Sequence, residues 1–254
     1  RGLTMGILER GMFQYIRAVE LSPSAYTCRG RFPMTLPAIQ RLGELELHPN
    51  VSFIVGENGA GKSTLLEAIA ISCGFNPEGG SRSFNFSTND THSDLSDFIK
   101  VTKGAASPDD GYFLRAESMY NLASNIDELN EDDGELIRFY GGKSLHAQSH
   151  GEAFVSLMMN RFGGKGLYIL DEPEAALSPT RQMALISRIN DLVKKQSQFI
   201  IATHSPIIMS YPNAQIFDIE NGYQIIDYKD TKHYAVTKEF LNNPEKMLKI
   251  LLED

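Results

Sequence analysis

The stretch VSFIVGENGAGKST, residues 51–64, decides the fold of this chain. Its first part, VSFIV, is mostly apolar and predicts a buried β-strand. Glycine follows at once, and the residues after the glycine-rich loop place Leu65, Leu66, Ile69 and Cys73 at helical spacing before Gly74, a suitable residue to end a helix. The order of strand, glycine loop and helix is typical of a loop that holds a phosphate group.

Residues 56–64, GENGAGKST, fit the pattern G-x-x-x-x-G-K-[ST]. Backbone N–H groups wrap a phosphate where side chains do not intrude, so Gly59 and Gly61 are expected close to the ligand. Lys62 is expected to reach the β- and γ-phosphates, and Ser63 to offer its hydroxyl to Mg²⁺. The alternative is a glycine-rich turn that matches by chance, which the flanking strand and helix disfavour. The predicted nucleotide-binding residues here are Gly56, Glu57, Asn58, Gly59, Ala60, Gly61, Lys62, Ser63 and Thr64.

Two carboxylates follow a second apolar run, LYILDEP, residues 167–173. Ligands bind at the carboxyl ends of strands in open α/β sheets, and two acids there are costly unless a cation or substrate uses them. Asp171 is therefore predicted to orient a Mg²⁺ ion, together with Ser63, and Glu172 to polarise the attacking water. The alternative interpretation is a strand end whose acids are simply solvated.

A third strand-like run, FIIATHSP, residues 199–206, ends in the same way at His204. If this strand lies beside the one that ends in Asp171, His204 reaches the γ-phosphate or the attacking water as a hydrogen-bonding sensor. A histidine with a purely structural hydrogen bond is the alternative. The predicted catalytic residues are thus Lys62, Glu172 and His204.

The segment SLHAQSHGEAF, residues 144–154, admits four interpretations. A metalloprotease site fails because Ala147 stands where H-E-x-x-H requires glutamate, and a serine hydrolase lacks its G-x-S-x-G elbow. A capping box formed by Ser149 and Glu152 explains a helix start but not Gly151 between them. The fourth interpretation includes this cap: the helix start is a second phosphate-binding device that meets the nucleotide of another subunit. Ser149 and Gly151 then complete a nucleotide site across a symmetric dimer.

Alternation of strands and helices along the chain predicts an α/β fold with a largely parallel sheet and helices on its faces. Strands are expected at 13–21, 45–47, 111–116, 214–219 and 223–228, besides those above, and helices at 149–160, 180–194 and 244–252. The loop-rich segment from about 79 to 147, with an acidic helical stretch at 121–135, looks like an inserted lobe. Because MFQYIRAVEL from Met12 resembles a natural start, residues 1–11 are interpreted as an upstream or vector remnant, and 12–254 as a single domain.

Composition limits the classes of function. The formal net charge of -8 and the pI near 5.3 argue against a generally basic face for nucleic acid or membrane. Two cysteines without a C-x-x-C pair suit reduced thiols in the cytoplasm rather than a disulfide framework. No apolar run approaches the roughly 20 residues that span a bilayer. We expect a cytoplasmic protein without an intrinsic membrane segment.

The order of these motifs resembles the ABC-type ATPases, specifically the soluble branch related to SMC and RecF proteins, and most of all the stand-alone bacterial ATPases described as AAA-family or ABC-like. The resemblance implies a P-loop NTPase fold of ABC type with an antiparallel N-terminal β part. It also implies ATP and Mg²⁺ as ligands, and an ATP-dependent, head-to-tail homodimer. Residues 56–64 become the Walker A loop, Asp171 and Glu172 the Walker B pair, 176–178 the D-loop, and Ser149, Gly151 and Glu152 the signature motif.

The chain also departs from the family pattern. Gln148 and His150 replace the leucine and first glycine of the usual Leu-Ser-Gly-Gly signature. No clear Q-loop glutamine follows GYFLRA, and Glu117 is the nearest polar candidate. Tyr26 and Phe32 are candidates for the aromatic residue that stacks on adenine.

Three functions follow from the resemblance. The first is a soluble ATP-driven switch whose homodimer acts on an unknown effector protein or nucleic acid. The second is the nucleotide-binding subunit of an ABC transporter, which the missing glutamine and the sequence DEPEAA disfavour. The third is a defence component that restrains an effector. Only 87 positions separate Lys62 from Ser149, without heptads, so the long coiled coil of SMC proteins is excluded.

Overall fold

A computed structural model of the chain describes residues 13–28, 30–82, 93–117, 124, 126 and 144–252. The predicted leading remnant, residues 1–11, lies outside these residues. So do residues 83–92, 118–123, 125 and 127–143 of the predicted inserted lobe, which include nearly all of its acidic helical stretch at 121–135. The prediction of a helical lobe therefore stays a prediction.

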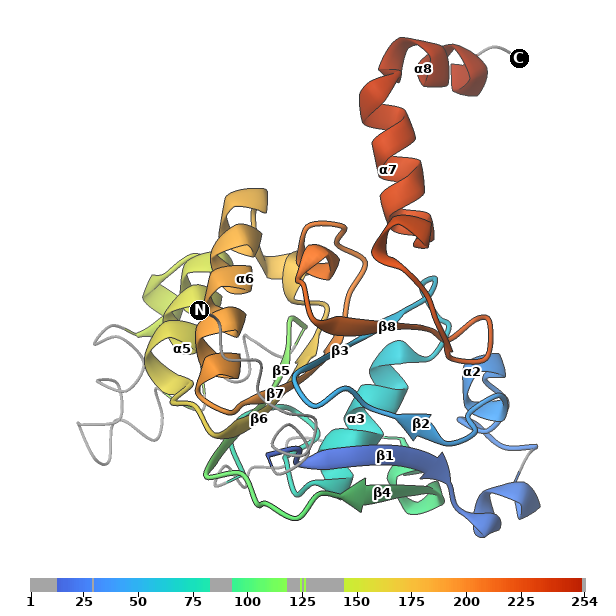
Figure 1. Cartoon of the computed structure of the whole chain (residues 1–254), viewed down its shortest axis with the longest axis vertical. Coiled ribbons are helices and arrows are strands. Elements are labelled where there is room, and N and C mark those ends of the chain that lie inside the picture. Colours follow the sequence, from blue (N-terminus) through green and yellow to red (C-terminus); the bar gives the residue numbers. More distant parts are fainter. Residues whose placement is uncertain are drawn as a thin grey trace, which may run out of the picture.

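A six-stranded sheet forms the centre of the molecule (Figure 1). Its strand order is β5-β6-β7-β3-β8-β9, and every neighbouring pair is parallel except β8 with β9. This confirms the predicted α/β class with a largely parallel sheet. The strands are β3 (Val51–Val55), β5 (Asp110–Arg115), β6 (Gly166–Asp171), β7 (Gln198–Ala202), β8 (Ala214–Asp218) and β9 (Gln224–Ile225).

The sheet is covered on both faces, which explains why β3, β6 and β7 are buried along their whole length. Neighbouring residues of one strand enter different cores. Phe53 belongs to the buried cluster that includes Leu157 of α5 (His150–Arg161) and the apolar residues of α6 (Pro179–Lys194). Ile54 belongs instead to the cluster that includes Leu65 of α3 (Lys62–Ser72). The helix that follows the glycine loop is therefore held between the central sheet and a second sheet (Figure 1).

That second sheet is antiparallel and has the order β2-β1-β4. Its strands are β1 (Ile16–Leu21), β2 (Leu45–Glu46) and β4 (Ile99–Lys103), so the predicted N-terminal β part also recruits a strand from later in the chain. The side chain of Gln198 joins the two sheets. Its amide oxygen accepts from the backbone N–H groups of Tyr15 and Ile16 at 3.0 and 2.9 Å, and its amide nitrogen donates to Ile16 O at 2.8 Å.

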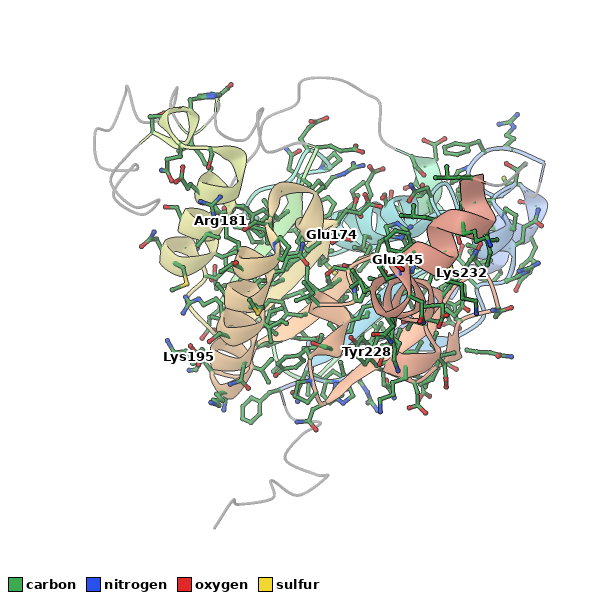
Figure 2. All side chains as sticks on the ribbon, turned by 90° about the horizontal axis from the view of Figure 1, so that it is seen from above. Glu174, Arg181, Lys195, Tyr228, Lys232 and Glu245 are labelled. Atoms are coloured by element: carbon green, nitrogen blue, oxygen red, sulfur yellow. The ribbon has the colours of Figure 1, made fainter. Side chains whose placement is uncertain are left out.

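Helices α5 and α6, which cover the face of the central sheet opposite α3, both begin at serine caps. Ser149 and Glu152 form the predicted capping box at α5, and Ser178 accepts a hydrogen bond from the backbone of Arg181 at α6. Figure 2 shows α6 from above, with Arg181 and Lys195 near its two ends. The remaining helical elements of the described chain are α2 (Pro37–Gln40), η1 (Pro23–Thr27), η2 (Asp94–Phe98), η4 (Leu145–Ala147), η5 (Pro173–Ala176), η6 (Ile208–Ser210), η7 (Tyr228–Asp230), α7 (Lys232–Asn242) and α8 (Pro244–Leu252).

Helices α7 and α8 stand away from the two-sheet body, and we call them the C-terminal arm (Figure 1). Neither helix has a buried residue. The sequence predicts α8 but not α7. It also predicts a strand at 223–228, whereas β9 has only two residues, because it pairs with β8 at two positions before the chain turns into η7. None of the described helices has both the length and the apolar character that a bilayer crossing requires.

Candidate functional site

The glycine-rich loop connects the end of β3 to the start of α3, as the sequence predicts. Gly59 and Gly61 have φ angles of 77° and 108°, a region that favours glycine. The Lys62 side chain is 3% exposed and folds back over the loop, where its Nζ donates to Gly56 O and Glu57 O at 3.0 Å each. Burial lowers the pKa of Lys62, while Glu172 and Asp171 act in the opposite direction. The loop thus encloses an ammonium group that ordinary backbone carbonyls hold in place.

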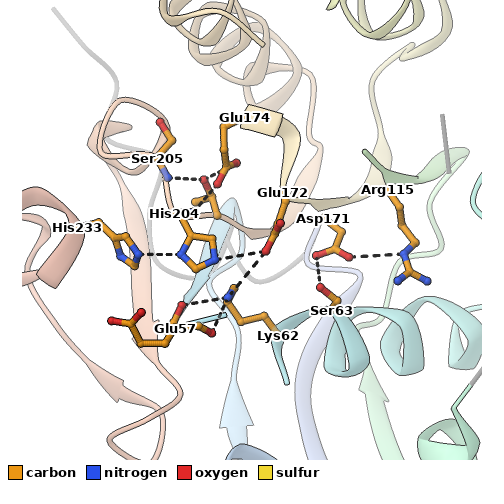
Figure 3. Close-up of polar contacts among 12 residues, drawn as sticks. Glu57, Lys62, Ser63, Arg115, Asp171, Glu172, Glu174, His204, Ser205 and His233 are labelled. Atoms are coloured by element: carbon orange, nitrogen blue, oxygen red, sulfur yellow. Dashed lines mark hydrogen bonds and ion pairs between the residues drawn. The ribbon is translucent and has the colours of Figure 1, made fainter. Parts of the chain in front are cut away.

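Asp171 ends β6 and faces the first turn of α3. Ser63 Oγ donates to Asp171 Oδ1 at 3.0 Å, and Arg115 Nε lies 3.6 Å from Asp171 Oδ2 (Figure 3). Burial raises the pKa of Asp171 to about 6, although Arg115 and the Ser63 hydroxyl lower it. Mg²⁺ prefers hard oxygen ligands such as a carboxylate and a hydroxyl, and a cation held here would favour the ionised form of Asp171 that burial disfavours. The two residues therefore fit the predicted metal role.

Arg115, which ends β5, is a residue of this network that the sequence analysis does not assign. Its Nη1 donates to Glu67 Oε2 at 2.6 Å, so the guanidinium links α3 to the end of β6. Its Nη2 also lies 4.0 Å from Glu117, the candidate for the metal-side position. Nothing in the local sequence marks Arg115, because its partners lie far from it along the chain.

Glu172 turns the chain sharply at the end of β6. Its φ and ψ angles of 49° and 52° place it in the left-handed region, which costs a residue other than glycine about 1–3 kcal/mol. The turn directs the Glu172 carboxylate to the other two predicted catalytic residues. Glu172 Oε1 lies 3.9 Å from Lys62 Nζ and 3.3 Å from His204 Nε2 (Figure 3). Strained backbone of this kind is common at functional sites.

His204 follows β7, the strand next to β6, so the carboxyl ends of the two strands meet as predicted. Glu174 holds this strand end, because its carboxylate accepts from Thr203 Oγ1 at 2.8 Å and from the backbone N–H of His204. The sequence analysis does not assign Glu174, although it stands only two residues after Glu172. Burial raises its pKa, and the hydrogen bonds from His204 and Thr203 lower it.

The start of α7 also reaches this site, which the sequence analysis does not foresee. His204 Nδ1 lies 2.8 Å from His233 Nε2, and Lys232 pairs with Glu57 of the glycine-rich loop. Figure 3 shows His233, His204 and Glu172 in a row that ends at Lys62. Seen from above, Lys232 lies on the opposite side of the molecule from Arg181 (Figure 2).

A cleft of about 440 Å³ opens beside these groups. Phe32 lines it with 65% of its surface exposed, and Glu117 also belongs to its wall. Tyr26, the other aromatic candidate, is not among the described residues that line it. Its lining residues are Phe32, Leu36, Asn58, Gly59, Gly61, Lys62, Ser63, Thr64, Glu117 and Glu172.

The predicted signature residues, Ser149, Gly151 and Glu152, do not line this cleft among the described residues. Ser149 is exposed and engaged in the capping box, where its Oγ lies 2.8 Å from Glu152 Oε2. Gly151 is buried, and a Cβ there would lie 2.6 Å from Ala176 O and 2.5 Å from Arg181 Nη1. The close approach of α5 to residues of the predicted D-loop thus accounts for this glycine within one subunit. The side chain of His150 lies outside the described part of the chain.

Comparison with known proteins adds a family to this geometry. Residues 38–246 match the family model described as AAA domain. No curated protein matches the sequence. Among solved structures, the chain is similar to the SMC head domain from Thermotoga maritima, with 16% identity, a TM-score of 0.44, and coverage of 84% of this chain and 98% of that one. It is also similar to cbiO1 from Clostridium perfringens, part of the ABC transporter complex cbiONQ, with 18% identity, a TM-score of 0.45, and coverage of 92% and 97%.

Proposed function

Because its residues 38–246 match the family model, the chain belongs to the AAA-domain family, and we propose that it is a Mg²⁺-dependent ATP hydrolase that works as an ATP-sandwiched homodimer. Membership confirms the resemblance to AAA-family ATPases, and the chain is an ATPase of that type. The metal, the dimer, the roles of single residues and the effector belong to the proposal.

One observation carries the proposal: four polar side chains converge at the ends of three neighbouring strands. Lys62 lies on the loop and helix after β3, Asp171 ends β6, Glu172 follows it, and His204 follows β7. Lys62 and Glu172 line the open cleft, while Asp171 contacts Ser63 of its wall and His204 lies beside Glu172. We assign them the roles of cation, base, metal ligand and hydrogen-bond donor. Such a set suits positioning and charge stabilisation in phosphoryl transfer, where the protein has little covalent chemistry to perform.

ATP would enter the cleft with its phosphates on the glycine-rich loop, where the N–H groups of residues 56–61 and the start of α3 favour an anion. Lys62 would exchange its two carbonyl acceptors for phosphate oxygens. Ser63 and Asp171 would hold Mg²⁺, which neutralises negative charge on the β- and γ-phosphates when it is bound. Phe32, on the cleft wall, is the aromatic side chain available to stack on adenine.

Hydrolysis would depend on Glu172 and His204. Glu172 would accept a hydrogen bond from the attacking water and orient its lone pair toward the γ-phosphorus. His204 would donate from Nε2 to a γ-phosphate oxygen, exchanging its contact with Glu172 at 3.3 Å. The two atoms that would act on water and phosphate, Glu172 Oε1 and His204 Nε2, thus already lie close to each other.

The first test of hydrolysis and dimer formation is Glu172→Gln. An amide cannot serve as the base, so turnover should fall by about 10²–10⁴-fold while ATP binding persists. In saturating Mg·ATP the variant should accumulate as a dimer, measured by light scattering after size-exclusion chromatography. Lys62→Ala is the matched control, because it should bind ATP weakly and remain a monomer. A Glu172→Gln protein that binds ATP and stays monomeric would rule out the sandwich.

The second test separates the role of Ser149 across the dimer from its cap within the subunit. Asparagine and aspartate are both good N-cap residues, but aspartate would also lie against the Glu152 carboxylate, so the thermal stability of each monomer is measured before dimer formation by Ser149→Asn and Ser149→Asp is compared. Aspartate adds a negative charge that would face the partner's γ-phosphate, whereas asparagine does not. We expect dimer formation and turnover to be lost in Ser149→Asp alone. Equal activity in both variants would place Ser149 outside the nucleotide site.

The work done by the dimer is proposed to be a conformational change of an effector protein or nucleic acid. ATPase assays with and without duplex DNA ends address the nucleic-acid branch, since stimulation would indicate a role in DNA metabolism. Recovery of a membrane protein with the tagged chain would favour the transporter-subunit alternative. Recovery of a nuclease or toxin would favour the defence alternative.

A further inference from the structure

His233 contacts His204, the histidine proposed above as the γ-phosphate sensor, at the ring nitrogen of His204 opposite the one that faces Glu172. His204 Nδ1 and His233 Nε2 are 2.8 Å apart, and the two rings meet edge to face with centroids 4.7 Å apart. On the other side of the same ring, His204 Nε2 lies 3.3 Å from Glu172 Oε1 (Figure 3). Nδ1 is therefore hydrogen-bonded to His233, whereas Nε2 lies at ion-pair distance from the Glu172 carboxylate without hydrogen-bond geometry to it.

The partners at the two nitrogens determine where the proton of a neutral His204 lies. A neutral imidazole carries one N–H, and an ionised carboxylate can only accept a hydrogen bond. The negative charge of Glu172, 3.3 Å from Nε2, favours the tautomer of His204 with its proton on Nε2. Its Nδ1 is then an acceptor, and the hydrogen bond at 2.8 Å requires His233 to donate its own Nε2–H.

We propose that His233 is a positioning residue that fixes His204 in the tautomer with its proton on Nε2, so that an N–H donor faces the γ-phosphate site. This inference rests on the proposed role of His204. It goes beyond that role because it assigns a function to the first turn of α7, which lies outside the strand ends that form the site.

Charge and burial around both rings support neutral histidines. Burial lowers the pKa of His204, and Lys62 and His233 act in the same direction, whereas Glu172 raises it. Burial also lowers the pKa of His233, and so do Lys62 and Lys232, against Glu57 and Glu220. The carboxylate of Glu174 also contacts His204, where it accepts a hydrogen bond from the His204 backbone N–H.

The anchorage of α7 gives His233 a defined position. Thr231, the N-cap residue, is 1% exposed, donates to Tyr228 O at 2.8 Å and accepts from the backbone N–H of Tyr234. His233 is the second residue of the helix that this cap begins. Lys232, beside it, pairs with Glu57 of the glycine-rich loop, so the first turn is attached to the site at two points.

The test reads the tautomer directly, by ¹⁵N NMR of the histidine rings in the nucleotide-free protein at a pH of about 8. His204→Gln identifies the signals of His204 by their loss. In the wild type, Nε2 should carry the proton. His233→Gln keeps an N–H donor and should keep that tautomer, whereas His233→Glu offers only an acceptor and should move the proton to Nδ1 or add a second one. Lys232→Met removes the other contact of α7 and should leave the tautomer unchanged.

A wild-type proton on Nδ1, or the same His204 spectrum in His233→Gln and His233→Glu, would overturn the inference. Turnover provides a second measurement: we expect His233→Glu to lower kcat about tenfold with little change in KM for ATP, and His233→Gln to recover most of it. Equal kcat in the two variants would also refute it. If the wild type hydrolyses no ATP, the proposed function fails, and the NMR result still decides the tautomer.

Discussion

Replacing Asp171 by asparagine should make the metal-free, nucleotide-free protein more stable. Burial raises the pKa of this carboxyl to about 6 against a usual 3.8, even though Arg115 and Ser63 favour the ionised form. Over the pH interval between these two values the folded state holds a proton that the unfolded chain has released. The free energy of unfolding therefore falls as pH rises from about 4 to about 6, and stays low above that interval.

The size of the effect follows from the two pKa values. At about 1.36 kcal/mol per pH unit, the interval from 3.8 to about 6 corresponds to about 3 kcal/mol that the ionised carboxylate costs the fold above pH 6. Asparagine keeps the shape and can still bond to Ser63, but it carries no charge. At a pH of about 8 we expect Asp171→Asn to gain up to about 3 kcal/mol, a rise in Tm of about 6–12 °C for a chain of this size.

Thermal unfolding should be followed by circular dichroism in the presence of a chelator, since the chain has no tryptophan. Asp110→Asn is the matched control with the opposite sign. Burial alone would raise the pKa of Asp110, but hydrogen bonds from Gly163 N–H and Tyr168 O–H and the Arg161 guanidinium hold it below its usual value. This carboxylate contributes stability above its unfolded pKa that is lost as pH falls, so its amide variant should melt lower than the wild type.

An Asp171→Asn protein that melts at or below the wild-type temperature at a pH of about 8 would refute this reasoning. So would an unchanged dependence of Tm on pH between about 4 and 6. The same variant should lose Mg²⁺-dependent ATP turnover, because it lacks the anionic oxygen proposed to hold the metal. A gain in stability together with a loss of turnover would show that this acid is kept at the expense of the fold.

Three further predictions follow from packing. Gly151→Ala should destabilise the protein by about 1–3 kcal/mol, because its Cβ would press on the backbone of Ala176, and a Tm equal to that of the wild type would contradict the packing argument. Gln198→Leu should cost about 2–4 kcal/mol in urea unfolding, since it leaves the buried N–H groups of Tyr15 and Ile16, at the start of β1, without an acceptor; a loss below about 1 kcal/mol would show that the two sheets do not depend on it. Cys28 should react with maleimide in the folded protein, whereas Cys73, whose thiol pKa burial raises to about 11, should react only after unfolding; Cys28→Ser should then show no fast labelling.

Much of the fold could be predicted from the sequence because its determinants are local. The apolar run of β3, the glycines with positive φ and the serine cap of α5 each act within a few residues. Strand ends carrying Asp171 and His204 could be placed together because parallel neighbours bring their carboxyl ends to one edge. These are the features for which sequence pattern and structure agree.

The rest of the site depends on contacts between distant segments. Arg115 meets Glu67 across 48 positions, and His233 meets His204 across 29, without any periodic pattern that would mark either pair. Helix α7 was equally hard to foresee, since it buries no residue and so lacks the apolar stripe that identifies a helix packed on a core. Gly151 shows the converse: the sequence drew attention to it, and the structure adds a packing reason that no spacing rule contains.

Strand β7 restricts which parts of the molecule can move. Its first residue, Gln198, is bonded to the antiparallel sheet, and the residues just beyond its last are bonded to Glu174, so about 17 Å of extended backbone is clamped at both ends. A strand that is bonded at both ends holds His204 in a fixed position relative to the core. We therefore expect movement during turnover to concentrate in elements outside these two attachments, such as α5 and the part of the arm beyond the first turn of α7, while the central sheet stays fixed.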